Sequence, residues 1–222
     1  MSSIAENIRR ITATLPEGVA LCAVSKFHPV ESLQQAYDAG QRIFGESRVQ
    51  ELLAKMPQMP TDVRWHFIGH LQTNKVRQII GRTAMIESVD SERLLSLINS
   101  ESQRAGVTTN LLMQIHVAAE DTKFGFTPDE LIDFFRCRKH ESLQYVRFCG
   151  VMGMATNTDD TERITADFNT ITNTLKAIKE IAPEMEHFNS ISMGMSDDYP
   201  LAIECGSTMV RVGTGIFGSR GY

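Results

Sequence analysis

Short apolar runs alternate with helical patterns along the whole chain, and this alternation constrains the fold more than any other feature of the sequence. The runs are rich in β-branched and aromatic residues, and each precedes a stretch with apolar residues at helical spacing. Repeated βα units favour a parallel sheet, either an open doubly wound sheet or a closed (β/α)8 barrel. Because there are about eight such units, we predict an α/β fold of the closed (β/α)8 TIM barrel type, with residues 1–222 in a single domain.

The boundaries of these units follow from the turn and cap residues. We predict strands at Val19–Lys26, Arg42–Ser47, Arg64–Gly69, Ala84–Val89, Asn110–Val117, Val146–Met152, His187–Met193 and Thr208–Gly213. The predicted helices are one opened by Ser3 with Glu6, Val30–Ala39 with Pro29 in a first-turn position, Val49–Lys55, Thr73–Ile80, Ser91–Ala105, one opened by Thr127 with Pro128 and Glu130, one carrying Ile164 to Ile178, Asp198–Glu204, and a last short turn.

Composition and charge exclude several classes of protein. The 222 residues are 42% hydrophobic and 22% charged, without an apolar run long enough to span a membrane. The net charge of −5 is opposite in sign to that of a non-specific nucleic-acid-binding surface. The N-terminal segment MSSIAENIRR lacks the apolar stretch of a signal peptide. We therefore expect a cytoplasmic protein that binds neither nucleic acid nor membrane.

The cysteines and histidines do not indicate a metal site. The four cysteines, which are Cys22, Cys137, Cys149 and Cys205, form no CxxC pair, so we expect them to be small buried side chains. His66 and His70 lie in a predicted strand and turn, a placement that does not indicate a shared metal-binding face. We predict no metal ligands.

Reactive groups of a barrel gather where its strands end, so the residues at the strand ends indicate the chemistry. Lys26 ends the first strand beside an apolar core, where partial desolvation favours the neutral, nucleophilic amine; the alternative is a lysine that extends to water. Arg211 alternates with Val210 and Val212, so it points into the barrel mouth unless it forms a surface ion pair.

Glycines follow the last strand, where Gly213 to Gly218 match GxGxxG. A dinucleotide site would need a further βαβ unit, and only about four residues follow the motif. The glycines instead fit a phosphate held by backbone N–H groups at the start of a short terminal helix, or else simple tight turns. Together with Lys26 and Arg211 they suggest a phosphorylated aldehyde as the ligand.

At these residues the sequence closely resembles the pyridoxal phosphate homeostasis protein family. The matching stretches are Ala23 to Pro29 (AVSKFHP), Phe44 to Glu51 (FGESRVQE), Trp65 to Lys75 (WHFIGHLQTNK) and Ser192 to Arg220. The family fold is a barrel like the N-terminal domain of alanine racemase. The resemblance implies that pyridoxal 5'-phosphate (PLP) is the cofactor and that the chain is a single PLP-binding barrel.

The resemblance also implies a role for each residue of the site. Lys26 would form the internal aldimine, a Schiff base with PLP. Ser192, Gly213 and Thr214 would hold the phosphate, and Arg211 would face the pyridine nitrogen. At Ser47 the chain departs from the family, because the expected FGEN reads FGES and a short hydroxyl replaces a side-chain amide near the cofactor.

Three functions are compatible with a barrel that carries these residues. A homeostasis protein would hold PLP without catalytic turnover. An amino-acid racemase of the related fold would need a second acid or base, which the resemblance places in an added C-terminal domain; we expect none here, and Tyr37, Tyr145, Tyr199 and Tyr222 are not obvious substitutes. A phosphosugar enzyme without a cofactor would use paired carboxylates or a metal cluster at the strand ends, for which Glu46, Glu87 and Asp90 are the candidates. We predict the first, as a monomer whose protein partners are transient apo-PLP-enzymes.

Overall fold

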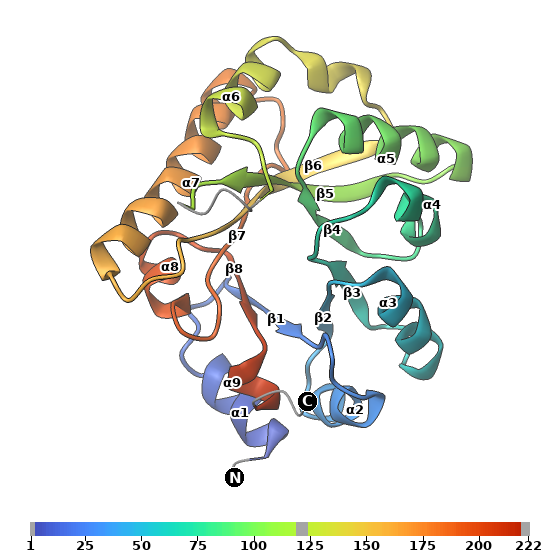
Figure 1. Ribbon diagram of the computed structural model, residues 1–222, viewed down its shortest axis with the longest axis vertical. Helices are drawn as coiled ribbons and strands as arrows, with labels where there is room; N and C mark the ends of the chain where they lie inside the picture. The colour runs from blue at the N-terminus through green and yellow to red at the C-terminus, as the bar shows by residue number, and fades with distance from the viewer. Residues whose placement is uncertain (1–2, 119–123, 219–222) are drawn as a thin grey trace.

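Eight parallel strands form a closed barrel in the computed structural model, which describes residues 3–118 and 124–218. Each strand pairs with the next, and β1 pairs with β8 to complete the ring (Figure 1). The strands are β1 Ala20–Val24, β2 Ile43–Glu46, β3 Arg64–Phe67, β4 Met85–Val89, β5 Thr109–His116, β6 Val146–Met154, β7 Ser190–Ser192 and β8 Met209–Val212. The predicted (β/α)8 barrel is confirmed.

Helices surround the barrel on its outer side (Figure 1). They are α1 Ile4–Thr12, α2 Val30–Asp38, α3 Val49–Lys55, α4 Val76–Ile79, α5 Glu92–Ala105, α6 Pro128–Arg136, α7 Thr161–Ile181, α8 Tyr199–Glu204 and α9 Thr214–Phe217. Short 3-10 turns occur at η1 Met56–Gln58, η2 Thr73–Lys75 and η3 Lys139–Ser142. The first and last helices, α1 and α9, lie side by side.

Local sequence explains where several helices begin and end. Ser3 caps α1 and Thr127 caps α6, each in a reciprocal capping box with a glutamate three residues later. Ser91 accepts a hydrogen bond from Leu94 N at the start of α5, and Gly106 ends that helix in the left-handed conformation, with φ +67°. Helices α1 and α6 begin where their cap residues predict, and α5 begins one residue after the predicted start at Ser91.

The core has two parts because a barrel strand presents alternate residues to its two faces. Residues such as Phe44 and Ile86 are fully buried in the large cluster that includes the surrounding helices. A small apolar cluster of Met85, Leu112 and Met152 comes from β4, β5 and β6. Glu87 lies two positions after Met85 on the same face of β4, so the barrel interior also contains buried charge.

Some boundaries and one burial prediction differ from the structure. The strands β1 and β7 are shorter than predicted, and Pro29 is the N-cap residue of α2 instead of its first-turn residue. Only Cys22 is buried as expected; Cys137 is exposed, and Cys149 and Cys205 are half-buried. Within the described ranges, no helix has both the length and the apolar character needed to cross a membrane.

Candidate functional site

A pocket of about 210 Å³ lies where the C-terminal ends of the strands meet. Five of the six predicted site residues line it: Lys26, Ser47, Arg211, Gly213 and Thr214. The other lining residues are Val24, His28, Ile68, Met154, Met195, Ser196 and Asp197. The barrel therefore brings together groups that follow β1, β2 and β8, as the rule for strand ends predicts.

Lys26 follows β1 in a turn and is half-buried at the pocket. The turn begins at Ser25, which is fully buried and whose N–H donates to Gly45 O of β2 at 3.0 Å. This turn places Lys26 beyond the end of β1, at the mouth of the barrel. An amine in this position can reach a ligand that enters from the C-terminal side of the barrel.

Arg211 is the cation beneath the pocket, with 5% of its surface exposed. Its Nη1 donates to both the carbonyl oxygen and the Oγ of Ser192 at 2.7 Å, and its Nη2 donates to Gly153 O at 2.9 Å. These bonds fix the guanidinium plane against β6 and β7. The prediction that Arg211 points into the barrel mouth is confirmed, and the alternative of a surface ion pair is wrong.

Ser192 is the predicted site residue that does not line the pocket. It is fully buried, and its hydroxyl donates to Glu87 Oε2 at 2.5 Å while accepting from Arg211. Its predicted contact with a phosphate stays a prediction; β7 ends at Ser192, and the loop beyond it contributes to the pocket. Ser196 brings a hydroxyl from that loop to the pocket, where its Oγ accepts from Gly215 N at 3.2 Å.

The turn after β8 supplies the glycines of the GxGxxG match. Gly213 lies close to β1, since a Cβ atom there would be 3.3 Å from the Val24 carbonyl oxygen. The carbonyl oxygen of Gly213 accepts from Ile216 N and Phe217 N at 2.9 Å, which closes the turn into α9. Thr214, the first residue of α9, is exposed at the pocket.

Ser47 reaches the pocket from the end of β2 because Gly69 makes room for its backbone. A Cβ atom at Gly69 would lie 2.5 Å from Ser47 O and 2.7 Å from Ser47 Cα. The segments that follow β2 and β3 are therefore in direct backbone contact. The short hydroxyl of Ser47 faces the pocket where the family resemblance leads us to expect an amide.

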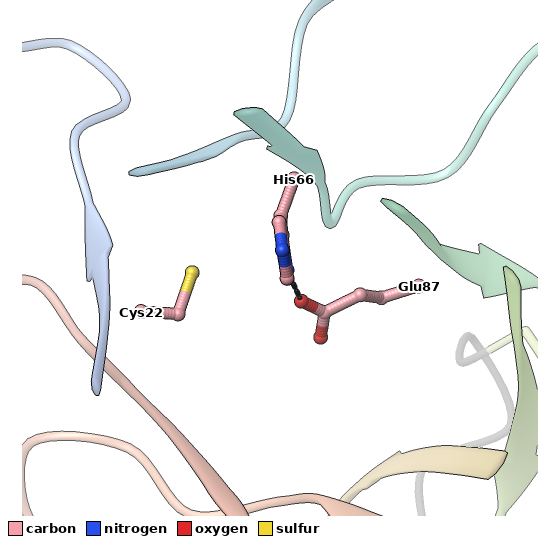
Figure 2. A group of neighbouring side chains, drawn as sticks. All are labelled: Cys22, His66 and Glu87. Carbon is pink, nitrogen blue, oxygen red and sulfur yellow. Dashed lines mark hydrogen bonds and ion pairs between the residues drawn. The ribbon is translucent and has the colours of Figure 1, made fainter. Parts of the chain in front are cut away.

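Below the pocket, His66, Glu87 and Cys22 point toward one another inside the barrel (Figure 2). His66 Nδ1 lies 2.6 Å from Glu87 Oε1, and the other carboxylate oxygen accepts from Ser192. Burial alone would raise the pKa of Glu87, but the hydrogen bond and charge of His66, assisted by Arg211 and Ser192, outweigh it and lower the pKa. A continuous polar chain thus joins His66 to Arg211.

The same three side chains have atoms of the metal-ligating kind within 4.8 Å of one another. Both oxygens of Glu87 already accept hydrogen bonds, and the Arg211 guanidinium lies 4.0 Å away as a counter-charge. Burial, with the nearby Glu87 charge, raises the pKa of the Cys22 thiol and so disfavours the thiolate that a metal would need. These contacts describe a hydrogen-bonded network in which the carboxylate is balanced by Arg211.

The three carboxylates considered for phosphosugar chemistry are not paired with one another. Glu46 bonds Lys55 at 2.8 Å, Glu87 bonds His66, and Asp90 bonds His70 at 2.8 Å. Each is bound to a different basic side chain, and none of them lines the pocket. Sequence reasoning missed the Glu46–Lys55 pair, although a glutamate that ends an apolar parallel strand already indicates a buried partner.

Comparison with known proteins places this pocket in a family. Residues 1–221 match the family described as alanine racemase, N-terminal domain. A pyridoxal phosphate homeostasis protein from Schizosaccharomyces pombe is 40% identical over 206 residues, which are 91% of this chain and 84% of that protein. The chain belongs to the pyridoxal phosphate homeostasis protein family.

Solved structures extend the family comparison to the fold. PipY of Synechococcus elongatus, a protein solved with PLP bound, is 35% identical, with a TM-score of 0.89 and coverage of 97% of this chain and 100% of PipY. Its structure without PLP gives a TM-score of 0.92. An alanine racemase from Clostridium difficile has a TM-score of 0.76 at 17% identity, and the match spans 56% of that chain, so it shows the barrel fold alone.

The pocket of this family member fits a phosphorylated aromatic aldehyde. It combines a lysine amine, a guanidinium that can only donate hydrogen bonds, and a turn whose backbone at Gly213 lies close to Val24. The hydroxyls of Ser196 and Thr214 add donors suited to a phosphate. Sequence reasoning missed Ser196, although the residue lies in the stretch that carries the family resemblance.

Proposed function

We propose that this protein binds PLP reversibly and holds it as a Schiff base on Lys26 without turning over a substrate. Neutral Lys26 Nζ would attack the aldehyde carbon of PLP, and a C=N bond would form with release of one water molecule. The observation that carries the proposal is the pocket itself, in which Lys26, Arg211 and the turn at Gly213 meet. PLP supplies the aldehyde, and the protein supplies the amine and its placement.

The remaining groups would orient the cofactor. Thr214, Ser196 and the backbone of the Gly213 turn would hold the phosphate, while Ser47 would lie near the ring from the opposite rim. Arg211 would face the pyridine nitrogen. A guanidinium donates but cannot accept, so it would leave that nitrogen unprotonated and the ring a weaker electron sink. This electronic setting favours holding PLP over reactions at the α-carbon of an amino acid.

The position of the tyrosines supports a role without turnover over racemisation. A racemase needs a second acid or base on the opposite face of its substrate. Tyr37 Oη bonds Asp62 at 2.7 Å and Tyr199 Oη bonds Thr14 at 3.2 Å, and no described tyrosine lines the pocket. Tyr222 lies outside the described residues.

Borohydride reduction tests the attachment site. The purified protein incubated with PLP should show the absorption band of a Schiff base, and reduction should fix the cofactor on the peptide that contains Lys26. The Lys26→Arg variant should lose the band, whereas Lys75→Arg, a lysine outside the pocket, should keep it. A label on another lysine would contradict the assignment.

Deuterium exchange separates the two functions. We expect no incorporation of solvent deuterium at the α-carbon of either enantiomer of common amino acids beyond that caused by free PLP. Faster exchange would support the racemase instead.

We further propose that the protein acts as a monomer and passes PLP to apo-PLP-enzymes. The test compares how fast an apo-enzyme is activated by the PLP-loaded protein and by free PLP at the same concentration.

A further inference from the structure

The two peptide groups next to Lys26 are both held by side chains of one short helix, α3. Lys55 Nζ donates to the carbonyl oxygen of Ser25 at 2.8 Å, on one side of Lys26. Glu51 Oε1 accepts from the backbone N–H of Phe27 at 2.6 Å, on the other side. Glu51 and Lys55 also bond each other at 2.6 Å, so they form a single clamp around the lysine turn.

A third charged residue, Glu46 at the end of β2, connects the clamp to the barrel. Lys55 Nζ also donates to Glu46 Oε1 at 2.8 Å, and this same oxygen accepts from Ser25 Oγ at 2.6 Å. The side chains of Glu46 and Lys55 are 0% and 8% exposed, so neither charge can turn to water. Because all three donors of the Lys55 ammonium are used, its position is closely determined.

The backbone at Phe27 shows what the clamp must hold in place. Phe27 has φ +69°, a left-handed conformation that is unfavourable for a non-glycine residue. Such a conformation persists when surrounding contacts determine it. Two contacts hold this residue from α3: its N–H donates to Glu51, and the Arg48 guanidinium lies 4.7 Å above its ring. Both partners come from α3 or its N-cap.

We propose that Glu51 and Lys55 are positioning residues that set the direction and reach of Lys26 toward the PLP aldehyde. The inference rests on the proposed function, since it assumes that Lys26 forms the Schiff base with loss of water. The clamp touches only the backbone of the turn and does not line the pocket, so it acts through the placement of Lys26. Displacement of a reacting group by about 1 Å can slow a reaction about a hundredfold.

Glu51 is the better residue to change. Its removal leaves Lys55 paired with Glu46, whereas removal of Lys55 leaves two carboxylates without their cation. Glu51→Ala deletes the acceptor for Phe27 N–H, and Glu51→Gln retains a side-chain oxygen in its place. Glu101→Ala is a matched control, because Glu101 pairs with Arg104 on α5 at 2.8 Å and is 11% exposed, against 19% for Glu51.

Two ligands separate the placement of Lys26 from the shape of the pocket. PLP can form the Schiff base, and pyridoxine 5'-phosphate, in which an alcohol replaces the aldehyde, can only occupy the site. With Glu51→Ala we expect Schiff-base formation, followed by its absorbance after rapid mixing, to slow about tenfold to a hundredfold. The Kd of pyridoxine 5'-phosphate should change less than about twofold, which is below the roughly fivefold change expected if the ligand itself lost a hydrogen bond. Glu51→Gln should recover most of the rate, and Glu101→Ala should match the unchanged protein.

Two outcomes would overturn the inference. In the first, Glu51→Ala forms the Schiff base at the unchanged rate. In the second, the variant loses both ligands equally, which would assign Glu51 a general structural role. Failure of the proposed function looks different, because the unchanged protein would then bind pyridoxine 5'-phosphate and PLP alike without forming a Schiff base at Lys26.

Discussion

Glu87 is an ionisable residue with no exposed surface, and its neighbours explain how the barrel accommodates it. His66 and Ser192 each bond one carboxylate oxygen, and Ser192 passes the interaction on to Arg211. Arg211, which we assign to the cofactor ring, is therefore oriented by Glu87, a carboxylate that does not line the pocket. At the scale of single residues, the site depends on buried side chains beneath the residues that line it.

Replacement of Glu87 by glutamine tests this arrangement. The folded protein lowers the pKa of Glu87 from the ordinary value of 4.5, so the ionised carboxylate stabilises the fold above that pH, and the benefit is lost as pH falls through the lowered folded value. We expect Glu87→Gln to reduce the free energy of unfolding by about 2 kcal/mol at neutral pH. Urea unfolding at several pH values should show the difference from the unchanged protein shrinking in acid; a constant difference would contradict the assignment.

Ser192 and Ser196 should separate stability from binding. Ser192→Ala leaves a buried oxygen of Glu87 without its donor and should lower the free energy of unfolding by about 1–3 kcal/mol. Ser196→Ala removes a hydroxyl from the pocket and should mainly raise the Kd of PLP, by about fivefold for a lost hydrogen bond of ~1 kcal/mol. Thermal unfolding and cofactor titration of both variants check this. If Ser192→Ala weakens PLP binding more than Ser196→Ala does, Ser192 contacts the phosphate.

At the scale of elements, the strand ends carry the site, and the glycines there set how closely neighbouring segments approach. Ser47 reaches the pocket beside Gly69 because no Cβ atom separates their backbones. The ends were also where sequence-based boundaries were least accurate. Lys26 was predicted to end the first strand, but β1 stops at Val24 and Lys26 lies in the turn that begins at Ser25.

Gly69→Ala should displace the Ser47 segment, since the added methyl would meet backbone atoms at 2.5 and 2.7 Å. We expect a loss of about 1–3 kcal/mol of stability, typical of overpacking, together with weaker PLP binding. Gly106→Ala serves as the comparison, because its φ of +67° strains an alanine while no atom lies within 4 Å. That variant should lose stability alone. Equal Kd values for PLP in the two variants would show that the contact with Ser47 does not shape the pocket.

The capping boxes show which parts of the elements could be predicted from sequence. Ser3 with Glu6 and Thr127 with Glu130 mark helix starts because both partners lie within one turn. Lys55 could not be predicted in the same way. Its position at the end of a short helix is typical of an exposed lysine, and only the tertiary fold brings it to Glu46 and Ser25.

At the scale of the molecule, the two ends of the described chain support the site together. Asn7 Nδ2 of α1 donates to Ile216 O of α9 at 2.9 Å, across a separation of 209 residues. The turn at Gly213 and Thr214 lies directly before that carbonyl. The barrel closure explains why Lys26, Arg211 and Gly213 were predicted together from the sequence: parallel strands in a closed ring must end at one rim. The position of Ser192 could not be predicted, because it depends on where β7 stops.

Asn7→Ala should therefore affect binding from a distance. Loss of the buried hydrogen bond leaves Ile216 O without this donor and should cost about 1–2 kcal/mol of stability. Because α9 begins at Thr214, we also expect a modestly higher Kd for PLP. Thr14→Ala, which removes a contact between Thr14 and Tyr199 at the surface, is a suitable control for binding. Unchanged PLP affinity in Asn7→Ala would show that α1 does not support the phosphate turn.

Because β8 is the neighbour of β1, a nascent chain cannot finish its barrel on the ribosome until the last strand has emerged. Until then β1 keeps one edge without its final partner, and such edges favour aggregation. The residues around the pocket also come from both of these strands, so a partly synthesised chain has no complete site. PLP can therefore bind a complete site only after β8 has been translated and has paired with β1.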